Sequence, residues 1–462
     1  MADDDKAKLY RRISSANIHL VLERMRVHGF WPAGQGLPPD PKDEVAARAA
    51  IEKEINQLRG TAVAGGIAAI EEALREERKR RWEASKKKRQ ERKKVREVRV
   101  VERRARWRDE KKDKIVHVGV GHSAGLQNVQ SDESKLRARE LPVLHTAADV
   151  AASAGVSMQK LRWLTFHRVG AALVHYHRYA IPKKTGGMRN ISAPKAALAD
   201  LQIWVLSRIL APLGAEPEAH GFVPGRSIVT NATPHVGQKM VINLDLKDFF
   251  PSVTFRRVKG LFEKIGYSEH VAILLALVCT EPPRLPVEVD GRKLWVALGE
   301  RMLPQGACTS PAITNLVCRR LDRRLAGLAK RRGYTYTRYA DDLTFSGEGH
   351  DGVALLFRGV RSIVKEEGFR EHPTKTRVMR PGRRQEVTGV VVNTKTAVAR
   401  VEVRVLRAIL HNAAKHGLAS QNREGHPNFE AHVRGRVAYV TMVDPTKATA
   451  LREALTRALG VR

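Results

Sequence analysis

The sequence predicts an α+β protein that carries a basic, mostly helical extension at its N-terminus. From about residue 141 onward, short β-rich runs such as 241–244 and 334–346 occur between segments with helical periodicity. Before that point apolar residues recur at helical spacing and then give way to dense charge. The length of 462 residues allows two or three domains around a substantial core.

Four stretches of different composition divide the chain. Residues 1–74 predict an N-terminal helical extension. Residues 75–140 predict a highly basic helix or arm followed by a linker, and as far as Lys114 they carry 21 basic and nine acidic side chains, a net +12. Residues 141–400 predict the compact α+β body, and residues 401–462 predict a C-terminal helical domain.

The overall charge indicates a partner with many phosphates. The chain has 83 Lys and Arg against 49 Asp and Glu, a net charge of +34 and a pI near 10.5. Contacts with phosphates release counterions, so such binding depends on salt. An anionic membrane is the competing interpretation, but the longest apolar runs, such as 271–279, are expected to be too short to span a bilayer.

The N-terminus and the cysteines predict a cytoplasmic protein. The first residues are polar and acidic, so no secretory signal is expected. Cys279, Cys308 and Cys318 are odd in number and show no CxxC spacing, which argues against a disulfide framework or a zinc site. These features fit a nucleic-acid-binding protein in a reducing cytosol, without indicating an enzyme.

The body is expected to contain the following elements in order. Residues 141–172 predict short helices, and 179–189 predict a β-hairpin with a glycine turn. An amphipathic helix is expected over 198–210 and a short buried strand over 241–244. Residues 334–346 predict a strand, a tight turn and a second strand.

Three aspartates stand at the ends of these strands. Asp245 closes the strand 241–244, while Asp341 and Asp342 lie in the turn of 334–346. Two adjacent acids cannot both be buried without a counter-charge, and Mg²⁺ prefers oxygen ligands. Nucleotidyl transfer uses two such cations held by a carboxylate cluster. The alternative is ordinary turn chemistry, for which aspartate is a common residue.

The surrounding motifs resemble those of bacterial retron reverse transcriptases. The resemblance rests on 243–252, 303–311, 339–342 and 368–376, in this order, and it extends over about 142–400. It implies an RNA-directed DNA polymerase with the right-hand polymerase fold. The fingers and palm, with an antiparallel palm sheet, would then occupy 141–400, and the helical thumb would occupy 401–462.

The resemblance also implies roles for the acids. Asp245 and Asp341 would be direct ligands of two Mg²⁺ ions, with Mn²⁺ as the alternative ion, and Asp342 would support the site. The main-chain carbonyl of Leu246 would complete the metal on the triphosphate side. Lys375 is the candidate general acid for the leaving pyrophosphate, with simple phosphate binding as the alternative.

A second group of residues would bind the nucleotide. Phe250 lies where the family places an aromatic ring beneath the sugar, so a preference for deoxynucleotides is expected; the alternative is ordinary core packing. Gln305 and Gly306 would bring backbone close to the nucleotide. Cationic side chains around the hairpin turn would clamp the triphosphate, unless they are only solvated: Lys183, Lys184 and Arg189.

Two short elements point to the retron group in particular. Asn231 and His235 form an NAxxH element just before the strand of Asp245. Val387, Thr388 and Gly389 form a VTG element, which the resemblance places where thumb meets palm and where the cognate RNA is read. Each pattern alone is usually structural; the two together favour a retron enzyme.

The resemblance further implies the reaction and the partners. The enzyme would bind its own structured non-coding RNA and deoxynucleoside triphosphates, and would prime synthesis from the 2′-hydroxyl of an internal guanosine. The product would be branched RNA–DNA (msDNA), in a system that defends against phage, with an effector protein as a candidate partner and no membrane. About seventy residues follow Asn393, too few for a ribonuclease H domain, so host ribonuclease H would remove the template.

Two alternatives remain open on the sequence. One is a group II intron-like or other bacterial reverse transcriptase that uses a 3′-hydroxyl primer. The other is a non-catalytic RNA-binding protein on a polymerase fold. Residues 1–140 exceed the smallest retron polymerases, and we hypothesise that this extension binds the structured RNA or a partner protein.

Overall fold

The computed structural model describes residues 18–32, 34–35, 42–183, 186–349 and 352–460. The chain divides into two compact units, Met1–Ala105 and Arg106–Arg462. The predicted triphosphate ligand Lys184 lies outside the described residues.

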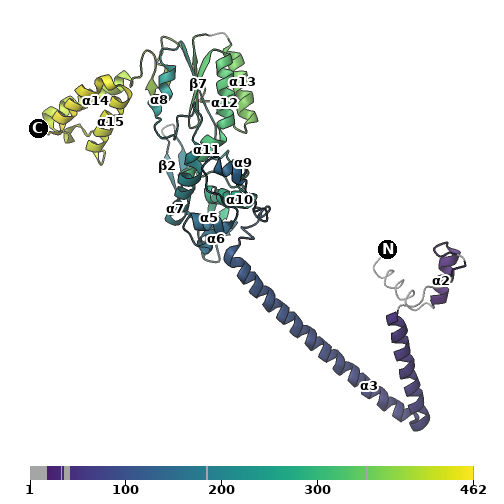
Figure 1. Cartoon of the computed structure of the whole chain (residues 1–462). Helices are drawn as coiled ribbons and strands as arrows, with labels where there is room; N and C mark the ends of the chain where they lie inside the picture. The colour runs from purple at the N-terminus through teal and green to yellow at the C-terminus, as the bar shows by residue number, and fades with distance from the viewer. Residues whose placement is uncertain (1–17, 33, 36–41, 184–185, 350–351, 461–462) are drawn as a thin grey trace. The chain divides into compact units, whose positions relative to one another are not determined.

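In the described part of the first unit, the regular elements are helices. Helix α2 spans Ile18–Val27, and α3 spans Lys42–Asp113, so α3 runs on into the second unit. Gly66 has φ 70° and breaks the helical path, and α3 bends there in Figure 1. The predicted division at residue 74 falls inside this helix, so it marks a change of composition and not of structure.

The structure corrects the linker predicted after Lys114. Ile115, Val118, Leu126 and Leu136 are all buried in the main hydrophobic core. These apolar side chains are widely spaced among polar ones and glycines, which gives the local sequence the texture of a linker. Their burial shows that the segment is part of the compact second unit.

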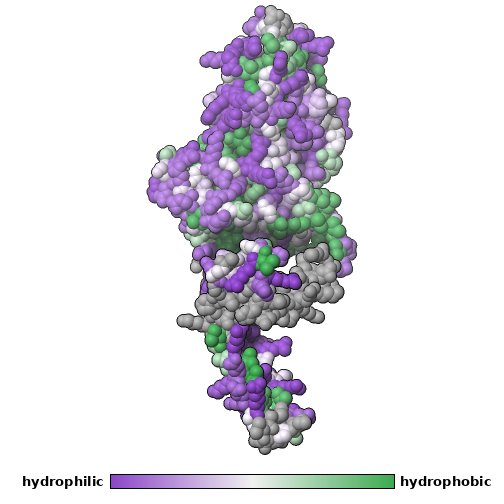
Figure 2. All heavy atoms as spheres, turned by 90° about the vertical axis from the view of Figure 1, so that its right-hand side faces the viewer, coloured by the Kyte–Doolittle hydropathy of each residue, from purple (hydrophilic) through white to green (hydrophobic). Residues whose placement is uncertain are grey.

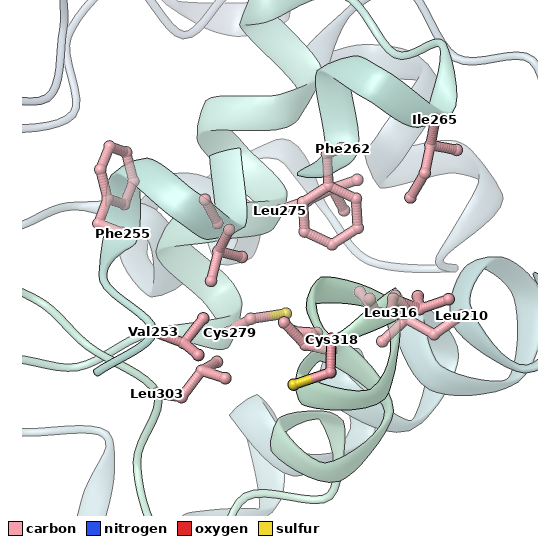
Figure 3. Packing of buried hydrophobic residues seen from close by; sticks show 14 of the residues in the cluster. Leu210, Val253, Phe255, Phe262, Ile265, Leu275, Cys279, Leu303, Leu316 and Cys318 are labelled. Carbon is pink, nitrogen blue, oxygen red and sulfur yellow. The ribbon is translucent and has the colours of Figure 1, made fainter. Parts of the chain in front are cut away.

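The main core surrounds helix α10, Glu269–Cys279, whose residues from His270 onward are all buried. Figure 3 shows part of this core, with Cys279 and Cys318 at its centre and Phe255, Phe262 and Ile265 of α9 (Phe255–Ile265) above them. All three cysteines are free thiols. The other helices before the C-terminal group are α4 (Glu133–Arg137), α5 (Ala147–Ser153), α6 (Met158–Thr165), α7 (Ala196–Val205), α8 (Ile228–Ala232) with the 3-10 turn η3 (Thr233–His235), α11 (Thr309–Val317), α12 (Arg319–Arg331) and α13 (Val353–Glu366).

Helix α7 continues through a π-turn, η1 (Leu206–Leu210), and a 3-10 turn, η2 (Ala211–Leu213). The stretch Ala196–Leu213 forms a helix that is long and apolar enough to cross a membrane, judged by length and composition alone. No such segment was predicted from the sequence. Leu198, Leu201 and Val205 on it are buried in the main core. Core packing therefore accounts for much of its apolar character.

A four-stranded antiparallel sheet has the order β7-β8-β4-β9. On its strand β4, Met240, Ile242 and Leu244 face the main core, whereas Val241 faces a second cluster. Because strand residues alternate between faces, Asp245 lies on the side of Val241. The strands are β4 (Met240–Asp245), β7 (Tyr334–Tyr339), β8 (Asp342–Gly347) and β9 (Arg377–Met379).

Three smaller sheets complete the strands. The predicted hairpin is confirmed as β2 (Tyr176–Pro182) paired with β3 (Met188–Pro194). Strand β10 (Glu386–Val387) pairs with β11 (Val390–Val391). The third sheet has the order β1-β6-β5 and comprises β1 (Gly170–Ala171), β5 (Arg284–Val289) and β6 (Arg292–Ala297).

The C-terminal helices lie where the sequence predicts a helical domain. Their second hydrophobic cluster joins Val403, Leu406 and Val437 to Val241 of β4 and Val387 of β10. The elements are α14 (Arg400–His416), η4 (Ala419–Gln421), α15 (Phe429–Val443), η5 (Pro445–Lys447) and α16 (Ala448–Leu459). Hydrophilic side chains cover most of the face of the molecule seen in Figure 2, as expected for a chain with 29% charged residues.

Candidate active site

The turn between β7 and β8 carries the two adjacent aspartates. Tyr339 pairs with Asp342 across the strands, which leaves Ala340 and Asp341 as the turn residues. Ala340 has φ 58°, a left-handed conformation suited to a tight turn. Gly221 lies directly beneath, since a Cβ built on it would stand 2.5 Å from Ala340 N. The turn is thus held against backbone that only glycine can supply.

Arg338 fixes the turn from inside the protein. Its guanidinium is fully buried and donates to both carboxylate oxygens of Asp322 at 2.7 and 2.6 Å. It also donates to Asn315 Oδ1 at 3.0 Å and to the Ala340 carbonyl at 3.1 Å. This role was not predicted from the sequence, although the place of Arg338 after Tyr334 and Tyr336 at alternate positions of a strand indicates an inward direction.

The three aspartates meet at the end of the sheet. Asp245 stands directly opposite Asp342 in the β4–β8 register, and Leu246 N donates to Asp341 O at 3.0 Å. Burial, with the charges of Asp341 and Asp245 added, raises the pKa of Asp342 to about 7. Burial and Asp245 likewise raise the pKa of Asp341. The cluster therefore has more negative charge than its protein surroundings neutralise.

Lys375 is the cation in contact with this cluster. Its ammonium donates to Asp245 Oδ1 at 2.8 Å, while almost half of its own side chain stays exposed. Among the described residues, no three His, Cys, Asp or Glu side chains already form a set that could hold a metal ion. The oxygen-only donors and the raised carboxyl pKa values nevertheless fit a hard divalent cation. The sequence predicted this convergence of Asp245, Asp341 and Asp342.

A pocket of 420 Å³ opens beside the acids. Asp245, Asp342 and Lys375 line it together with Thr388 and Gly389 of the VTG element. Residues that the sequence analysis left out also line it, among them Arg377, Arg384 and Glu386. The chain therefore brings part of its predicted catalytic group and part of its predicted RNA-specific group to one cavity.

Thr388 and Gly389 form the turn between β10 and β11. Their φ angles of 46° and 84° are those of a two-residue hairpin turn. The buried Asn231 donates from Nδ2 to Thr388 Oγ1 at 3.4 Å. Tyr439 of α15 donates to the Gly389 carbonyl at 3.2 Å. The NAxxH and VTG elements are therefore in direct contact.

His235 ties the NAxxH element to the sheet. Its ring nitrogens share hydrogen bonds with Ser346 Oγ at 2.6 Å and Thr337 Oγ1 at 2.8 Å. Burial lowers its pKa from 6.5 to about 3, so the ring is neutral. Asn231, His235 and Val387 are all fully buried. These three residues shape the site and have no surface to offer to RNA, so only Thr388 and Gly389 of the predicted RNA-specific group line the pocket.

Phe250, Gln305 and Gly306 are predicted nucleotide-binding residues. Phe250 is half-buried, with ring centroids 5.6 Å from Phe249 and 6.2 Å from Phe222. Gly306 has φ 121°, and a Cβ on it would stand 2.9 Å from the Ile191 side chain of β3. Gln305 O accepts from Ser192 N at 2.8 Å. In this structure the close approach at Gln305 and Gly306 is therefore to the hairpin strand.

The β2–β3 hairpin carries the other predicted nucleotide ligands. Lys183 N donates to Gly187 O at 2.9 Å, which closes the turn, and both Lys183 and Arg189 are exposed. The charge of Arg189 opposes the rise in the pKa of Asp341, so its guanidinium lies within electrostatic reach of the acids. The structure thus directs one of the two described cations toward the cluster.

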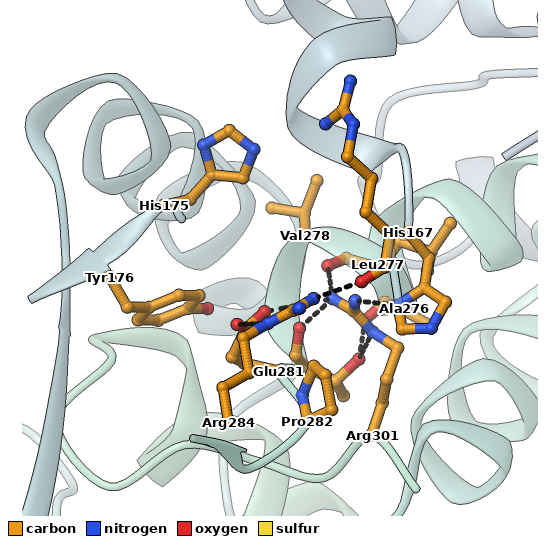
Figure 4. Close-up of polar contacts among 12 residues, drawn as sticks. His167, His175, Tyr176, Ala276, Leu277, Val278, Glu281, Pro282, Arg284 and Arg301 are labelled. Carbon is orange, nitrogen blue, oxygen red and sulfur yellow. Dashed lines mark hydrogen bonds and ion pairs between the residues drawn. The ribbon is translucent and has the colours of Figure 1, made fainter. Parts of the chain in front are cut away.

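A buried ionic cluster anchors the base of this hairpin. Arg178 of β2 donates to Glu281 at 2.7 Å, and Arg284 donates to the same carboxylate oxygen at 2.9 Å. Arg301 donates to Leu277 O at 2.7 Å and reaches His167 at 3.2 Å (Figure 4). These residues were not predicted from the sequence, because Arg178 lies 103 residues from Glu281 and His167 lies 134 residues from Arg301.

Comparison with known proteins agrees with this geometry. Residues 181–412 match the family described as reverse transcriptase (RNA-dependent DNA polymerase). The retron Mx65 and Mx162 reverse transcriptases of Myxococcus xanthus are 50% and 46% identical over 71% and 74% of this chain and 75% and 73% of their own. The retron Ec86 reverse transcriptase of Escherichia coli is 34% identical over 67% of this chain and 88% of its own. The chain therefore belongs to the retron reverse transcriptases and is an RNA-directed DNA polymerase.

Proposed function

We propose that this polymerase copies part of a structured non-coding RNA into DNA from the 2′-hydroxyl of an internal guanosine, giving branched msDNA. The observation that carries the proposal is the shared pocket. Thr388 and Gly389, which belong to the retron-specific VTG element, line the same cavity as Asp245, Asp342 and Lys375. An unusual primer needs a special surface next to the reacting carboxylates, and this cavity offers one.

Enzymes of this family use divalent metal ions, and we propose two Mg²⁺ ions, replaceable by Mn²⁺, for this chain. Asp245 and Asp341 would bind them directly, with Asp342 in support and the Leu246 carbonyl at the triphosphate side. Bound there, the ions would lower the pKa of the attacking hydroxyl and stabilise the leaving pyrophosphate. The buried acids with raised pKa values, Asp341 and Asp342, support this assignment because a cation would stabilise their charged forms.

Lys375 is proposed to act on the phosphate side of the reaction. Its ammonium is exposed enough to leave Asp245 and reach a phosphate, since the side chain is 49% accessible. As a general acid it would protonate the leaving pyrophosphate; as a phosphate ligand it would only neutralise charge. A solvent deuterium isotope effect that is lost in Lys375→Arg would favour the first role over the second.

In the same proposal the four-stranded sheet is the palm, the β2–β3 hairpin belongs to the fingers and the C-terminal helices form the thumb. Lys183, Arg189 and the undescribed Lys184 would clamp the triphosphate of the incoming deoxynucleotide, with Gln305 and Gly306 behind β3. Phe250 would lie beneath the sugar.

The cellular setting is also proposed. The partners would be the cognate RNA, its DNA product, deoxynucleoside triphosphates and an effector protein, in a cytoplasmic system that defends against phage. Host ribonuclease H would remove the copied RNA. The three free thiols are compatible with a reducing compartment.

The branch is the property to test. The purified protein would be incubated with its cognate RNA and deoxynucleotides, and the product treated with a 2′,5′-debranching enzyme. We expect the DNA to remain joined to RNA until debranching releases it with a 5′-phosphate. A product that is linear before treatment would instead establish a 3′-hydroxyl primer, as in intron-type enzymes.

A further inference from the structure

Five arginines of the first unit form a row on the second part of α3. Arg89, Arg92, Arg96, Arg99 and Arg103 follow one another at intervals of three and four residues. Residues at this spacing lie on one side of a helix, so the row runs straight along α3 for about 21 Å at 1.5 Å per residue. We call these five residues the arginine seam. Lys87 and Lys94 of the same stretch lie on other sides of the helix.

The seam has no partner within the described part of the chain. All five side chains are exposed, and no ion pair or hydrogen bond involves any of them. Farther back on α3 the pattern differs, because Arg81 contacts both Glu54 and Glu77 at 2.5 Å. Glu91 and Glu97 are immediate sequence neighbours of seam members, so helical geometry turns them about 100° away. Glu102, three residues after Arg99, lies closer to the seam.

The composition of the seam argues against a coiled-coil partner or a membrane and favours a partner with phosphates. A coiled coil needs apolar residues at this same spacing, and here the positions are all arginine. A helix that lies on a membrane needs a broad apolar face, whereas most side chains around the seam are charged. Arginine binds phosphate through a planar two-donor fork, and a straight row of such forks matches a rigid row of phosphates.

We propose that the arginine seam binds the phosphate backbone of a double-stranded segment of the RNA that this enzyme copies. The inference rests on the proposed RNA partner and assigns it a second contact surface outside the polymerase site. RNA duplexes are recognised mostly by shape and by backbone contacts. The seam supplies such contacts without reading sequence.

The test compares two variants of the full chain that lose the same charge. The seam variant is Arg89→Gln, Arg92→Gln, Arg96→Gln and Arg99→Gln. The matched control is Lys79→Gln, Arg80→Gln, Lys87→Gln and Lys94→Gln, all exposed positions on other sides of the same helix. Glutamine has nearly the helix propensity of arginine and lysine, so α3 is retained in both, which circular dichroism would verify.

Binding would be measured by fluorescence anisotropy with a labelled RNA hairpin whose stem has about 20 base pairs, over a series of KCl concentrations. We expect the seam variant to bind about 100-fold more weakly, with the slope of log K against log salt reduced by about three. The control should lose about threefold or less, with little change of slope. A lysine version of the seam should keep most of the slope and lose part of the affinity.

Three outcomes would overturn the proposal. Equal weakening in both variants would mean that unspecific charge binds the RNA. Unchanged binding in the seam variant would remove the site altogether. Loss of a copurifying protein, with hairpin binding intact, would assign the seam to a protein partner. DNA synthesis on a short RNA template with an annealed DNA primer should equal wild type in both variants. The hairpin-binding test of the seam and the debranching test of the primer can therefore fail independently.

Discussion

His235 was predicted as a residue specific to retron enzymes, and in the structure its buried ring connects neighbouring segments. The buried ring links Ser346 of β8 and Thr337 of β7 to the segment that carries Asn231, and Asn231 contacts the VTG turn. The sequence indicated that this histidine matters. Its burial could not be predicted, because the two hydroxyl partners lie more than 100 residues away along the chain.

A pH dependence follows from this burial. The folded state holds the pKa of His235 at about 3, below its usual 6.5, so below pH 6.5 the unfolded chain binds the extra proton. Stability should therefore be complete above that pH and fall as pH drops toward 3, by about 1.4 kcal/mol per unit from this residue. His235→Gln should be less stable at neutral pH and have a shallower slope in acid. Urea unfolding at several pH values measures this, and parallel profiles for the two proteins would contradict it.

The half-buried position of Phe250 fits two roles, a contact beneath the sugar of the nucleotide or ordinary core packing, and substitution of Phe250 distinguishes them. If its ring lies beneath the sugar, Phe250→Ala should raise ribonucleotide incorporation relative to deoxynucleotide by about 10- to 100-fold. Phe222→Ala, at the ring 6.2 Å away, is the control and should leave the ratio unchanged. Competitive single-nucleotide incorporation gives the ratio. A variant that only loses thermal stability would assign Phe250 to the core instead.

Among the elements of the fold, the strands were easier to predict than the residues from other segments that hold them in place. The hairpin β2–β3, strand β4 and the pair β7–β8 were predicted because their β-rich runs end at turn residues or at Asp245. The support of the β7–β8 turn was not predicted, since Arg338, Asp322 and Gly221 come from separate segments and meet only in three dimensions. The 115–140 segment was misjudged for the same reason.

The buried pair of Arg338 and Asp322 gives a prediction about element packing. It joins β7 to α12, and both side chains are fully inaccessible. Asp322→Ala would leave a buried guanidinium without its counter-charge, so we expect a loss of about 3–5 kcal/mol. Adding Arg338→Met should recover much of that loss by removing the charge. Chemical denaturation of the three proteins measures it; a double variant less stable than Asp322→Ala would contradict the account.

For the whole molecule, the division into two units predicts independent folding of the polymerase. Among the described residues, both hydrophobic clusters contain only residues from Ile115 onward. Removing residues 1–105 should therefore shift the thermal midpoint of the polymerase unit by less than about 2 °C. Synthesis on an RNA template with an annealed DNA primer should continue. An aggregated or unfolded truncated chain would show instead that the extension is part of the fold.

More of the candidate site than of the surrounding fold could be predicted from the sequence. Asp245, Asp341 and Asp342 stand in ordered motifs, and their convergence follows from antiparallel pairing of β4 with β8. The shared pocket could not be predicted, because it depends on how the turn of Thr388 and Gly389 is placed by Asn231 and Tyr439.

The central claim is that DNA synthesis takes place at the carboxylates of β4 and the β7–β8 turn. The most direct measurement is RNA-templated deoxynucleotide incorporation by wild type, Asp341→Asn and the exposed control Asp200→Asn, together with RNA binding by each. As a proposed metal ligand, Asp341 would supply several kcal/mol of transition-state stabilisation, so Asp341→Asn should be slower by about 1,000-fold with RNA binding kept. Asp200→Asn should match wild type. Synthesis by Asp341→Asn at the wild-type rate would contradict the account.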